Sequence, residues 1–281
     1  MDIVLPPRTV IESDVQRALA EDVGSGDLTA RLVPDVAAQA ELRTREDGVL
    51  CGSAWFDEVF RQLDARVQVA WNVPDGAFFV AGTVLCRLRG PARALLTGER
   101  TALNFLQTLS GTATLTARYV EAVRGTHAKV LDTRKTIPGL RHAQKYAVVC
   151  GGGHNHRMGL YDAVLIKENH IAAAGSVAVA LAQARALVAA DTLVEIEVEN
   201  LDQLRAALAA GATRILLDNF DLPGLGAAVR AAAGRAALEA SGSVTLDNIG
   251  AIAATGVDFI SVGGLTKHVQ ATDLSLRFLP S

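Results

Sequence analysis

Cysteine is scarce in this sequence, which has only Cys51, Cys86 and Cys150, far apart from one another. An odd number of widely separated cysteines suggests neither a disulfide framework nor a CxxC metal site. The opening residues, with Asp2 and Pro6-Pro7, also lack the basic and apolar regions of a secretory signal. We therefore expect a cytoplasmic protein with three reduced thiols packed in its core.

A strong charge of one sign is also missing, since the formal net charge is -3 for 281 residues. Such a balance argues against a surface for nucleic acid or anionic lipid, although a cationic pocket can lie inside it. No apolar run reaches the roughly 20 residues that span a bilayer, because Gln183 and Arg185 interrupt the longest candidate. We expect no nucleic-acid or membrane partner and a small molecule as ligand.

Half of the residues are hydrophobic and a fifth are charged, as in a globular protein. Up to about residue 125, segments of strand character at 37–45, 67–71 and 84–89 are separated by Gly- and Pro-containing turns. Helical patterns cover residues 13–20 and 92–123. This first part therefore predicts an α+β arrangement.

From about residue 128 onward, short apolar segments rich in β-formers alternate with Ala- and Leu-rich helical segments. This alternation is typical of βαβ units and a parallel sheet, wound like a barrel. A complete barrel has about eight strands, so six predict an incomplete one. The six segments are 129–132, 163–167, 193–198, 214–218, 236–240 and 258–262.

Polar residues and glycines follow the ends of these six segments. The carboxyl ends of parallel strands meet at one edge of a sheet, so these residues converge on one site. The residues are Asp132-Thr133-Arg134-Lys135, Lys167, Glu197, Asp218-Asn219, Ser241-Gly242-Ser243 and Val262-Gly263-Gly264.

The cations of this cluster, together with His156 and Arg157, indicate an anionic ligand, because so many positive charges repel one another without one. A single strand-end lysine or a single glycine turn would be ordinary on its own. The two glycine-containing loops offer backbone N–H groups to a phosphate. The sequence thus predicts a site for a small phosphorylated polyanion.

Two side questions stay open at this point. His154, His156 and His170 could be zinc ligands, but no cysteine or carboxylate lies at a supporting spacing, and anion binding fits better. Glu197 and Asp218 could hold Mg²⁺ through water, bond ribose hydroxyls, or simply pair with cations of the site.

Several longer motifs make the chain resemble the quinolinate phosphoribosyltransferase (decarboxylating) family over nearly its whole length. Each motif alone is suggestive, and their common order is specific. The motifs are EDVGSGDLT at 21–29, ERTALN at 99–104, LDTRKTIPG at 131–139, GGGHNHRMGLYDAVLIKENHI at 151–171, EIEVEN at 195–200, LLDNF at 216–220 and ISVGGLTKH at 260–268.

The resemblance implies an N-terminal α/β sandwich domain over residues 1–112 and an open α/β barrel of six or seven strands over 113–270. A tail at 271–281 would return to the first domain. It also implies a homodimer or hexamer in which each active site is shared between subunits. By motif match, Arg100 would reach into the neighbouring subunit's site.

The implied activity is that of a pentosyltransferase of NAD biosynthesis, which joins quinolinate to 5-phosphoribosyl-1-pyrophosphate with Mg²⁺. The products would be nicotinate mononucleotide, CO₂ and pyrophosphate. Lys135, Lys167, Glu197 and Asp218 would be catalytic, and Glu197 and Asp218 would position the metal through water. The implied substrate-binding residues are Arg100, Thr133, Arg134, Lys135, His156, Arg157, Lys167, Glu197, Asp218, Ser241, Gly242, Ser243, Val262, Gly263 and Gly264.

Two other readings remain open. A class I aldolase-like barrel would use Lys167 for a Schiff base and the glycine loops for a sugar phosphate, but it leaves Arg100, Arg134 and Arg157 unexplained. A relative that kept the fold could act in another pathway or as a ligand sensor. The intact NHRMGL and LIKENHI segments argue against the second reading.

Overall fold

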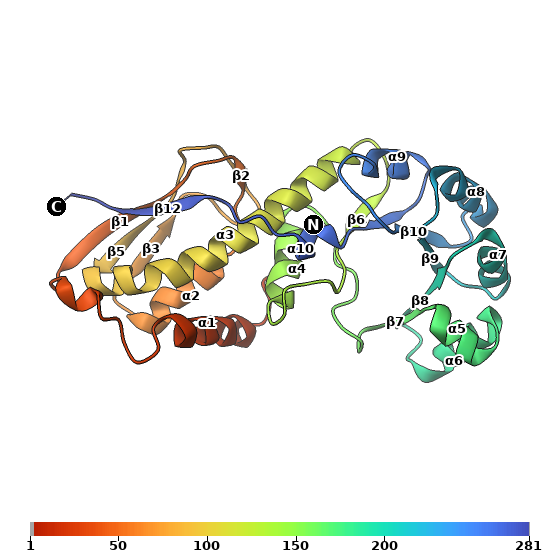
Figure 1. Cartoon of the computed structure of the whole chain (residues 1–281), viewed down its shortest axis with the longest axis horizontal. Coiled ribbons are helices and arrows are strands. Elements are labelled where there is room, and N and C mark those ends of the chain that lie inside the picture. The colour runs from red at the N-terminus through yellow and green to blue at the C-terminus, as the bar shows by residue number, and fades with distance from the viewer. Residues whose placement is uncertain (1–2, 281) are drawn as a thin grey trace. The chain divides into compact units, whose positions relative to one another are not determined.

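The computed structural model describes residues 3–280, which divide into two compact units (Figure 1). Unit 1 comprises the residues up to Ala117, Thr136–Gly152 and those from Leu265 onward. Unit 2 comprises Arg118–Lys135 and Gly153–Gly264. Domain limits after residues 112 and 270 remain a prediction from the sequence.

Unit 1 contains a four-stranded antiparallel sheet in the order β12-β1-β5-β3. One face is apolar and buried, with Leu42 and Leu88 among its residues, whereas Glu41 on the other face pairs with Arg43 and Arg87. Alternation of this kind gives a sheet with one face on the core. The strands are β1 (Ala37–Thr44), β3 (Gln68–Trp71), β5 (Val84–Pro91) and β12 (Leu274–Phe278), and a separate pair joins β2 (Gly48–Val49) to β4 (Phe78–Phe79).

Helices α2 (Ser53–Leu63) and α3 (Ala92–Ala122) supply much of the core of unit 1. Trp55 and Phe60 of α2 and Leu103 of α3 are almost fully buried with the sheet's apolar side chains. All three cysteines are free and buried. The remaining helices of this unit are α1 (Arg8–Asp22), η1 (Ala30–Leu32), α4 (Arg141–Cys150) and α10 (Gly264–Lys267).

Unit 2 is built on six parallel strands in the order β6-β11-β10-β9-β8-β7. Within residues 3–280, β6 and β7 do not pair with each other, so the sheet stays open. The strands are β6 (Lys129–Leu131), β7 (Ala163–Ile166), β8 (Leu193–Val198), β9 (Arg214–Asp218), β10 (Ala237–Ser241) and β11 (Phe259–Ser261).

A helix follows each of β7, β8, β9 and β10, as in a barrel winding (Figure 1). Side chains within the loops cap three of these helices, because Ser176, Asn200 and Asp221 each accept a backbone N–H of the first turn. The helices are α5 (Glu168–Ala174), α6 (Val177–Leu187), α7 (Leu201–Ala209), α8 (Leu222–Ala232) and α9 (Ile249–Ala254). The predicted fold, an N-terminal α/β domain followed by an incomplete barrel, is confirmed.

The helices differ in length and in apolar character. Within the part of the chain that the structure describes, no single helix is long and apolar enough to cross a membrane. Helices α5 and α6 reach that length and apolar character only when they are taken together, and the chain bends by 97° between them.

Candidate active site

The strand-end residues of unit 2 lie along one edge of the sheet, because its six strands are parallel. Lys167 directly follows β7, Glu197 is the penultimate residue of β8, and Asp218 and Ser241 end β9 and β10. Ser241 and Asp218 are also register partners on adjacent strands. The sheet therefore gathers the predicted cluster as the sequence indicated.

Lys167 and Glu197 form an ion pair at this edge, with 3.0 Å between Nζ and Oε2. Glu197 is 8% exposed, whereas 47% of the Lys167 side chain is open to solvent. Burial raises the pKa of Glu197, the bond from Lys167 opposes this, and the charge of Asp218 adds to the rise. Two carboxylates thus lie close enough to repel, which favours a cation between or beside them.

Asn219 joins Asp218 to the glycine loop of the next strand. Its side-chain amide donates to Asp218 Oδ2 at 2.8 Å, and its backbone N–H donates to Ser241 O at 2.9 Å. Asn219 adopts φ +56°, a left-handed conformation that asparagine tolerates better than most residues. A Cβ at Gly242, where φ is +109°, would lie only 2.1 Å from Asn219 Oδ1. Glycine is therefore required at position 242 on two counts.

The glycine loop after β11 lies beneath the side chain of Lys135. A Cβ at Gly263 would approach Lys135 Cδ to 2.9 Å and Thr133 Oγ1 to 3.6 Å. The Thr133 hydroxyl in turn accepts the backbone N–H of Lys135 at 3.0 Å. The loops after β6 and β11 are thus in contact, and the side chain of Lys135 lies against the backbone of Gly263.

Asp132 anchors the segment that carries His156 and Arg157. Its buried carboxylate accepts the Asn155 amide at 2.6 Å and the His156 backbone N–H at 2.9 Å. Burial and, after it, the charge of Arg134 lower the pKa of the half-buried Arg157 guanidinium. Arg134 and Arg157 therefore share one electrostatic neighbourhood, as two arms for a dianion would.

A buried charged network below this edge did not enter the site predicted from the sequence. Arg214 of β9 donates to Glu195 of β8 at 3.1 Å and to Glu239 of β10 at 2.6 Å, and its guanidinium lies 3.4 Å from the Phe259 ring centre. Both carboxylates are fully buried. In the sequence, this network is indicated by charged residues at inward-facing positions of strands that are otherwise apolar.

His156 connects this network to the edge. Its Nε2 lies 2.9 Å from Glu195 Oε2, and its Nδ1 accepts the backbone N–H of Arg157 at 2.7 Å. Burial disfavours the charged imidazole, but the bond to Glu195 and the charge of Glu239 outweigh it and raise the pKa of His156. The hydrogen bond from the Arg157 N–H favours the neutral ring instead, because it requires a lone pair on an unprotonated Nδ1.

The three histidines considered for zinc do not form a cluster among residues 3–280. His170 Nδ1 accepts the backbone N–H of Lys167 at the start of α5. Arg100 belongs to unit 1, where it is exposed on α3 and has no hydrogen-bond or ion-pair partner among the described residues.

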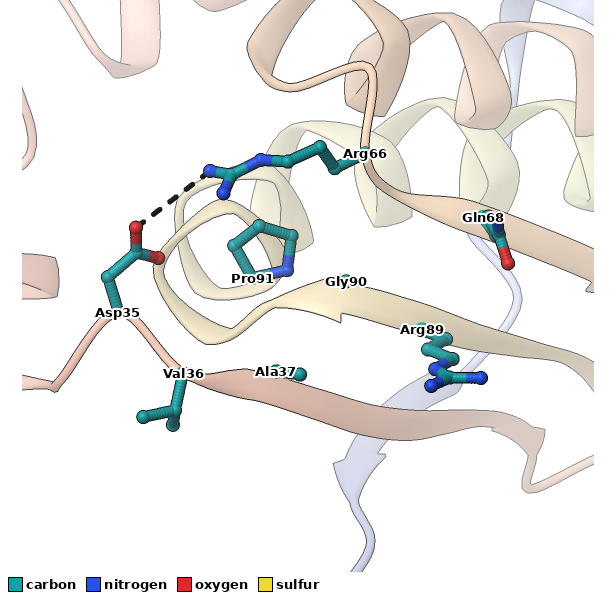
Figure 2. A pocket seen from close by; sticks show the side chains of 8 residues that line it. All are labelled: Asp35, Val36, Ala37, Arg66, Gln68, Arg89, Gly90 and Pro91. Carbon is teal, nitrogen blue, oxygen red and sulfur yellow. Dashed lines mark ion pairs between the residues drawn. The ribbon is translucent and has the colours of Figure 1, made fainter.

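A hollow of about 440 Å³ in unit 1 was not predicted (Figure 2). It lies at the end of β1, β3 and β5, and an ion pair of 3.8 Å between Arg66 and Asp35 crosses it. Asp64 also pairs with Arg66, at 2.7 Å. This hollow holds no convergent set of chemical groups comparable to the strand-end cluster.

Two family models match the chain. The model described as quinolinate phosphoribosyl transferase, N-terminal domain, matches residues 27–110, and the C-terminal domain model matches residues 112–277. A Mycobacterium leprae protein named nicotinate-nucleotide pyrophosphorylase (carboxylating) is 46% identical over 272 residues, covering 93% of this chain and 95% of that protein. A Bacillus subtilis protein with the same name, qualified as probable, is 43% identical over 257 residues, covering 91% and 89%.

The fold has an equally close counterpart among solved structures. The nicotinate-nucleotide pyrophosphorylase of Francisella tularensis superposes with a TM-score of 0.97 at 49% identity, covering 99% of both chains. A similarity of this extent includes both units.

Proposed function

Because the chain belongs to the quinolinate phosphoribosyl transferase family, we propose that it transfers the phosphoribosyl group of 5-phosphoribosyl-1-pyrophosphate to quinolinate with decarboxylation. The products are nicotinate mononucleotide, CO₂ and pyrophosphate, in NAD biosynthesis. Both proposed substrates are polyanions, one with two carboxylates and the other with a phosphate and a pyrophosphate.

This proposal rests on the residues at the carboxyl ends of the six strands of unit 2. Across the sheet, in the order β6-β11-β10-β9-β8-β7, the strand ends carry cations after β6, small residues after β11 and β10, carboxylates on β9 and β8, and Lys167 after β7. That order places the proposed phosphate-binding loops between the acid-binding cations after β6 and the carboxylates proposed to face the sugar.

In this proposal the chain segment between β6 and β7 holds the dicarboxylate. Arg134, Lys135 and Arg157, with Thr133 and His156 beside them, orient the acid so that its ring nitrogen faces the sugar. Lys167 lies between the acid and the pyrophosphate and offsets their negative charge. Ser241 to Ser243 and Val262 to Gly264 hold the 5-phosphate.

The reaction needs no nucleophile from the protein, because the pyridine nitrogen has a free lone pair. Positive charge grows on the sugar as pyrophosphate leaves, and Glu197 and Asp218 stabilise it. Loss of CO₂ then places an electron pair beside the new pyridinium, whose charge stabilises it. Rate enhancement by this site rests on positioning and charge.

Mg²⁺ is proposed as the cofactor. Hard oxygen ligands suit it, and the mutual repulsion of Glu197 and Asp218 gives both carboxylates a reason to accept a divalent cation, directly or through water. When bound, Mg²⁺ would neutralise the departing pyrophosphate. Lys167 already occupies one oxygen of Glu197, so water-mediated contact fits this side chain better.

The remaining parts of the proposal concern assembly and location. We propose a cytoplasmic homodimer or hexamer in which Arg100 completes the site of a neighbouring subunit. Arg100 is exposed on α3 and its side chain has no partner within residues 3–280, which is consistent with that role. Against the aldolase reading, Lys167 Nζ is engaged in an ion pair with Glu197, and Arg100, Arg134 and Arg157 would have no role.

The decisive experiment follows labelled CO₂ released from quinolinate labelled in its 2-carboxylate. Release that requires both the phosphoribosyl donor and Mg²⁺, with an equal amount of nicotinate mononucleotide, is the expected result. A folded, oligomeric protein that releases no CO₂ under these conditions would exclude the proposed activity and leave the sensor reading.

A further inference from the structure

His156 uses both ring nitrogens for bonds within the protein. Nε2 lies 2.9 Å from the Glu195 carboxylate and Nδ1 lies 2.7 Å from the backbone nitrogen of Arg157. A backbone N–H can only donate and an ionised carboxylate can only accept, so the neutral ring carries its proton on Nε2. A direct bond from His156 to a ligand would require one of these two bonds to break.

Arg214 fixes the carboxylate to which His156 donates. Its Nε holds Glu195 Oε1 at 3.1 Å, while its Nη2 holds Glu239 Oε2 at 2.6 Å. The ring of Phe259 covers the guanidinium at 3.4 Å. Two fully buried carboxylates on the strands that flank β9 would repel strongly without a cation between them.

Glu239 is a second carboxylate that faces His156, so the orientation of the two carboxylates decides which one bonds to the ring. Its Oε1 lies 3.7 Å from His156 Nε2 and has no hydrogen-bond partner among the described residues. Both carboxylates therefore face the same imidazole nitrogen, and only Glu195 is close enough to accept its proton. The two-point grip of Arg214 sets which carboxylate is in reach.

We propose that Arg214 and His156 are positioning residues of the dicarboxylate site and that neither contacts the ligand. Arg214 donates to Glu195, and Glu195 accepts the proton of His156 Nε2. Nδ1 of the same ring accepts the backbone N–H of Arg157 and so fixes its position. The guanidinium of Arg157 is then the group that meets the acid. This inference rests on the proposed function for the identity of the ligand, and it gives His156 a role different from the substrate contact that the sequence suggested.

The first test measures equilibrium binding of quinolinate and, separately, of 5-phosphoribosyl-1-pyrophosphate. Arg214→Lys keeps the charge but loses the planar two-point grip. The expected result is a quinolinate Kd raised on the order of tenfold, with donor binding changed by less than about twofold. The control is Arg185→Lys, which removes two bonds, to Ala210 O and Gly211 O, on the outer helices.

The second test reads His156 itself by ¹⁵N NMR of histidine-labelled protein, with its signals assigned by their loss in His156→Asn. In the wild type, Nε2 should carry the proton and Nδ1 should be unprotonated in the neutral ring, before and after quinolinate is added. Arg214→Lys should change these signals, and Arg185→Lys should not.

Three outcomes are decisive. A quinolinate-dependent change at Nε2 of the wild type would mean direct contact and would overturn the role of His156. An Arg214→Lys protein with unchanged quinolinate Kd and unchanged signals would overturn the role of Arg214. A wild type that binds no quinolinate would instead refute the proposed function, and the NMR comparison would still decide the positioning network.

A charge-balanced variant covers the case in which Arg214→Lys fails to fold. Arg214→Met combined with Glu239→Gln removes one positive and one negative charge from the buried network, so its net charge is unchanged, and Glu195 keeps its bond to His156. The same rise in quinolinate Kd and the same change in the His156 signals are expected.

Discussion

Arg134 offers the sharpest single-residue test of the proposed acid-binding side. Replacing it with Ala removes bonds to a charged ligand, each of which contributes about 1.5–3 kcal/mol. We expect the quinolinate KM to rise about 10- to 100-fold, while the KM of the phosphoribosyl donor changes little. Equal losses for both substrates in steady-state kinetics would contradict the assignment.

The matched control for this variant is Arg205→Ala. Arg205 is an exposed arginine of the same unit that pairs with Asp202 on α7. An exposed helix pair of this kind contributes little to stability. Its loss should leave both KM values unchanged.

Glu239 gives a second prediction, on stability. Burial, with help from the charge of Glu195, raises the pKa of Glu239 from its ordinary 4.5 to about 6. Between these values the folded state holds a proton that the unfolded state has lost, so the stability contributed by Glu239 falls as the pH rises. The loss is complete at about pH 7, one unit above the pKa of the folded state.

The variant Glu239→Gln cannot titrate at this position. Relative to it, the wild type should lose about 2 kcal/mol of unfolding free energy as the pH rises from 4 to 7. Urea unfolding of both proteins across this range measures the difference. A difference that is independent of pH would mean that Glu239 is not shifted.

At the scale of elements, the loop after β10 should be the most sensitive to added atoms. Gly242→Ala places a methyl group 2.1 Å from Asn219 Oδ1 in a backbone conformation that disfavours side chains. Asn219 holds Asp218, so we expect phosphoribosyl-donor affinity to fall at least about tenfold with quinolinate binding retained. Isothermal titration with each ligand tests this separation.

Gly234→Ala separates the two effects of that change. Gly234 has φ +75°, but nothing lies within 4 Å of an added Cβ, and it sits in the turn before β10 instead of after it. This variant should lose about 1 kcal/mol of stability and no donor affinity. If both glycine variants lose donor affinity, the loop is not a phosphate site.

The six strands of unit 2 could be predicted to within one or two residues because each is a short apolar run bounded by a helix signal or a turn. Helix α2 was not predicted, although Trp55, Phe56, Val59 and Phe60 have helical spacing. Its N-terminus is capped from a distance, since Asp75 accepts the backbone N–H groups of Gly52 and Ser53. Sequence patterns around the helix itself contain no such signal.

The strand-end cluster could be predicted from the sequence, whereas the buried network of Arg214 beneath it could not. Motif positions and the parallel sheet alone bring Lys167, Glu197 and Asp218 to one edge. The bonds of Arg214 join residues 19 and 25 positions away on other strands, and their existence depends on strand order and register. A charged residue inside a strand was visible, but its partners were not.

At the scale of the whole molecule, a shared active site can be tested by mixing two inactive proteins. In the proposed shared site, Arg100→Ala would damage the residue that one subunit gives to its neighbour, and Lys135→Ala would damage the site that receives it. Random exchange in a dimer makes half of the assemblies mixed, each with one intact site, so about a quarter of wild-type activity should return. No recovery after demonstrated subunit exchange would mean that each subunit works alone.

The pairing of β12 with β1 has a consequence for synthesis of the chain. Emergence of β1 from the ribosome comes early, but its partner along one edge is separated from it by all of unit 2. Until β12 arrives, β1 presents unpaired backbone groups, the kind of edge to which foreign strands add. The unit that is translated first is therefore completed last, and the nascent chain must protect that edge while the barrel strands form.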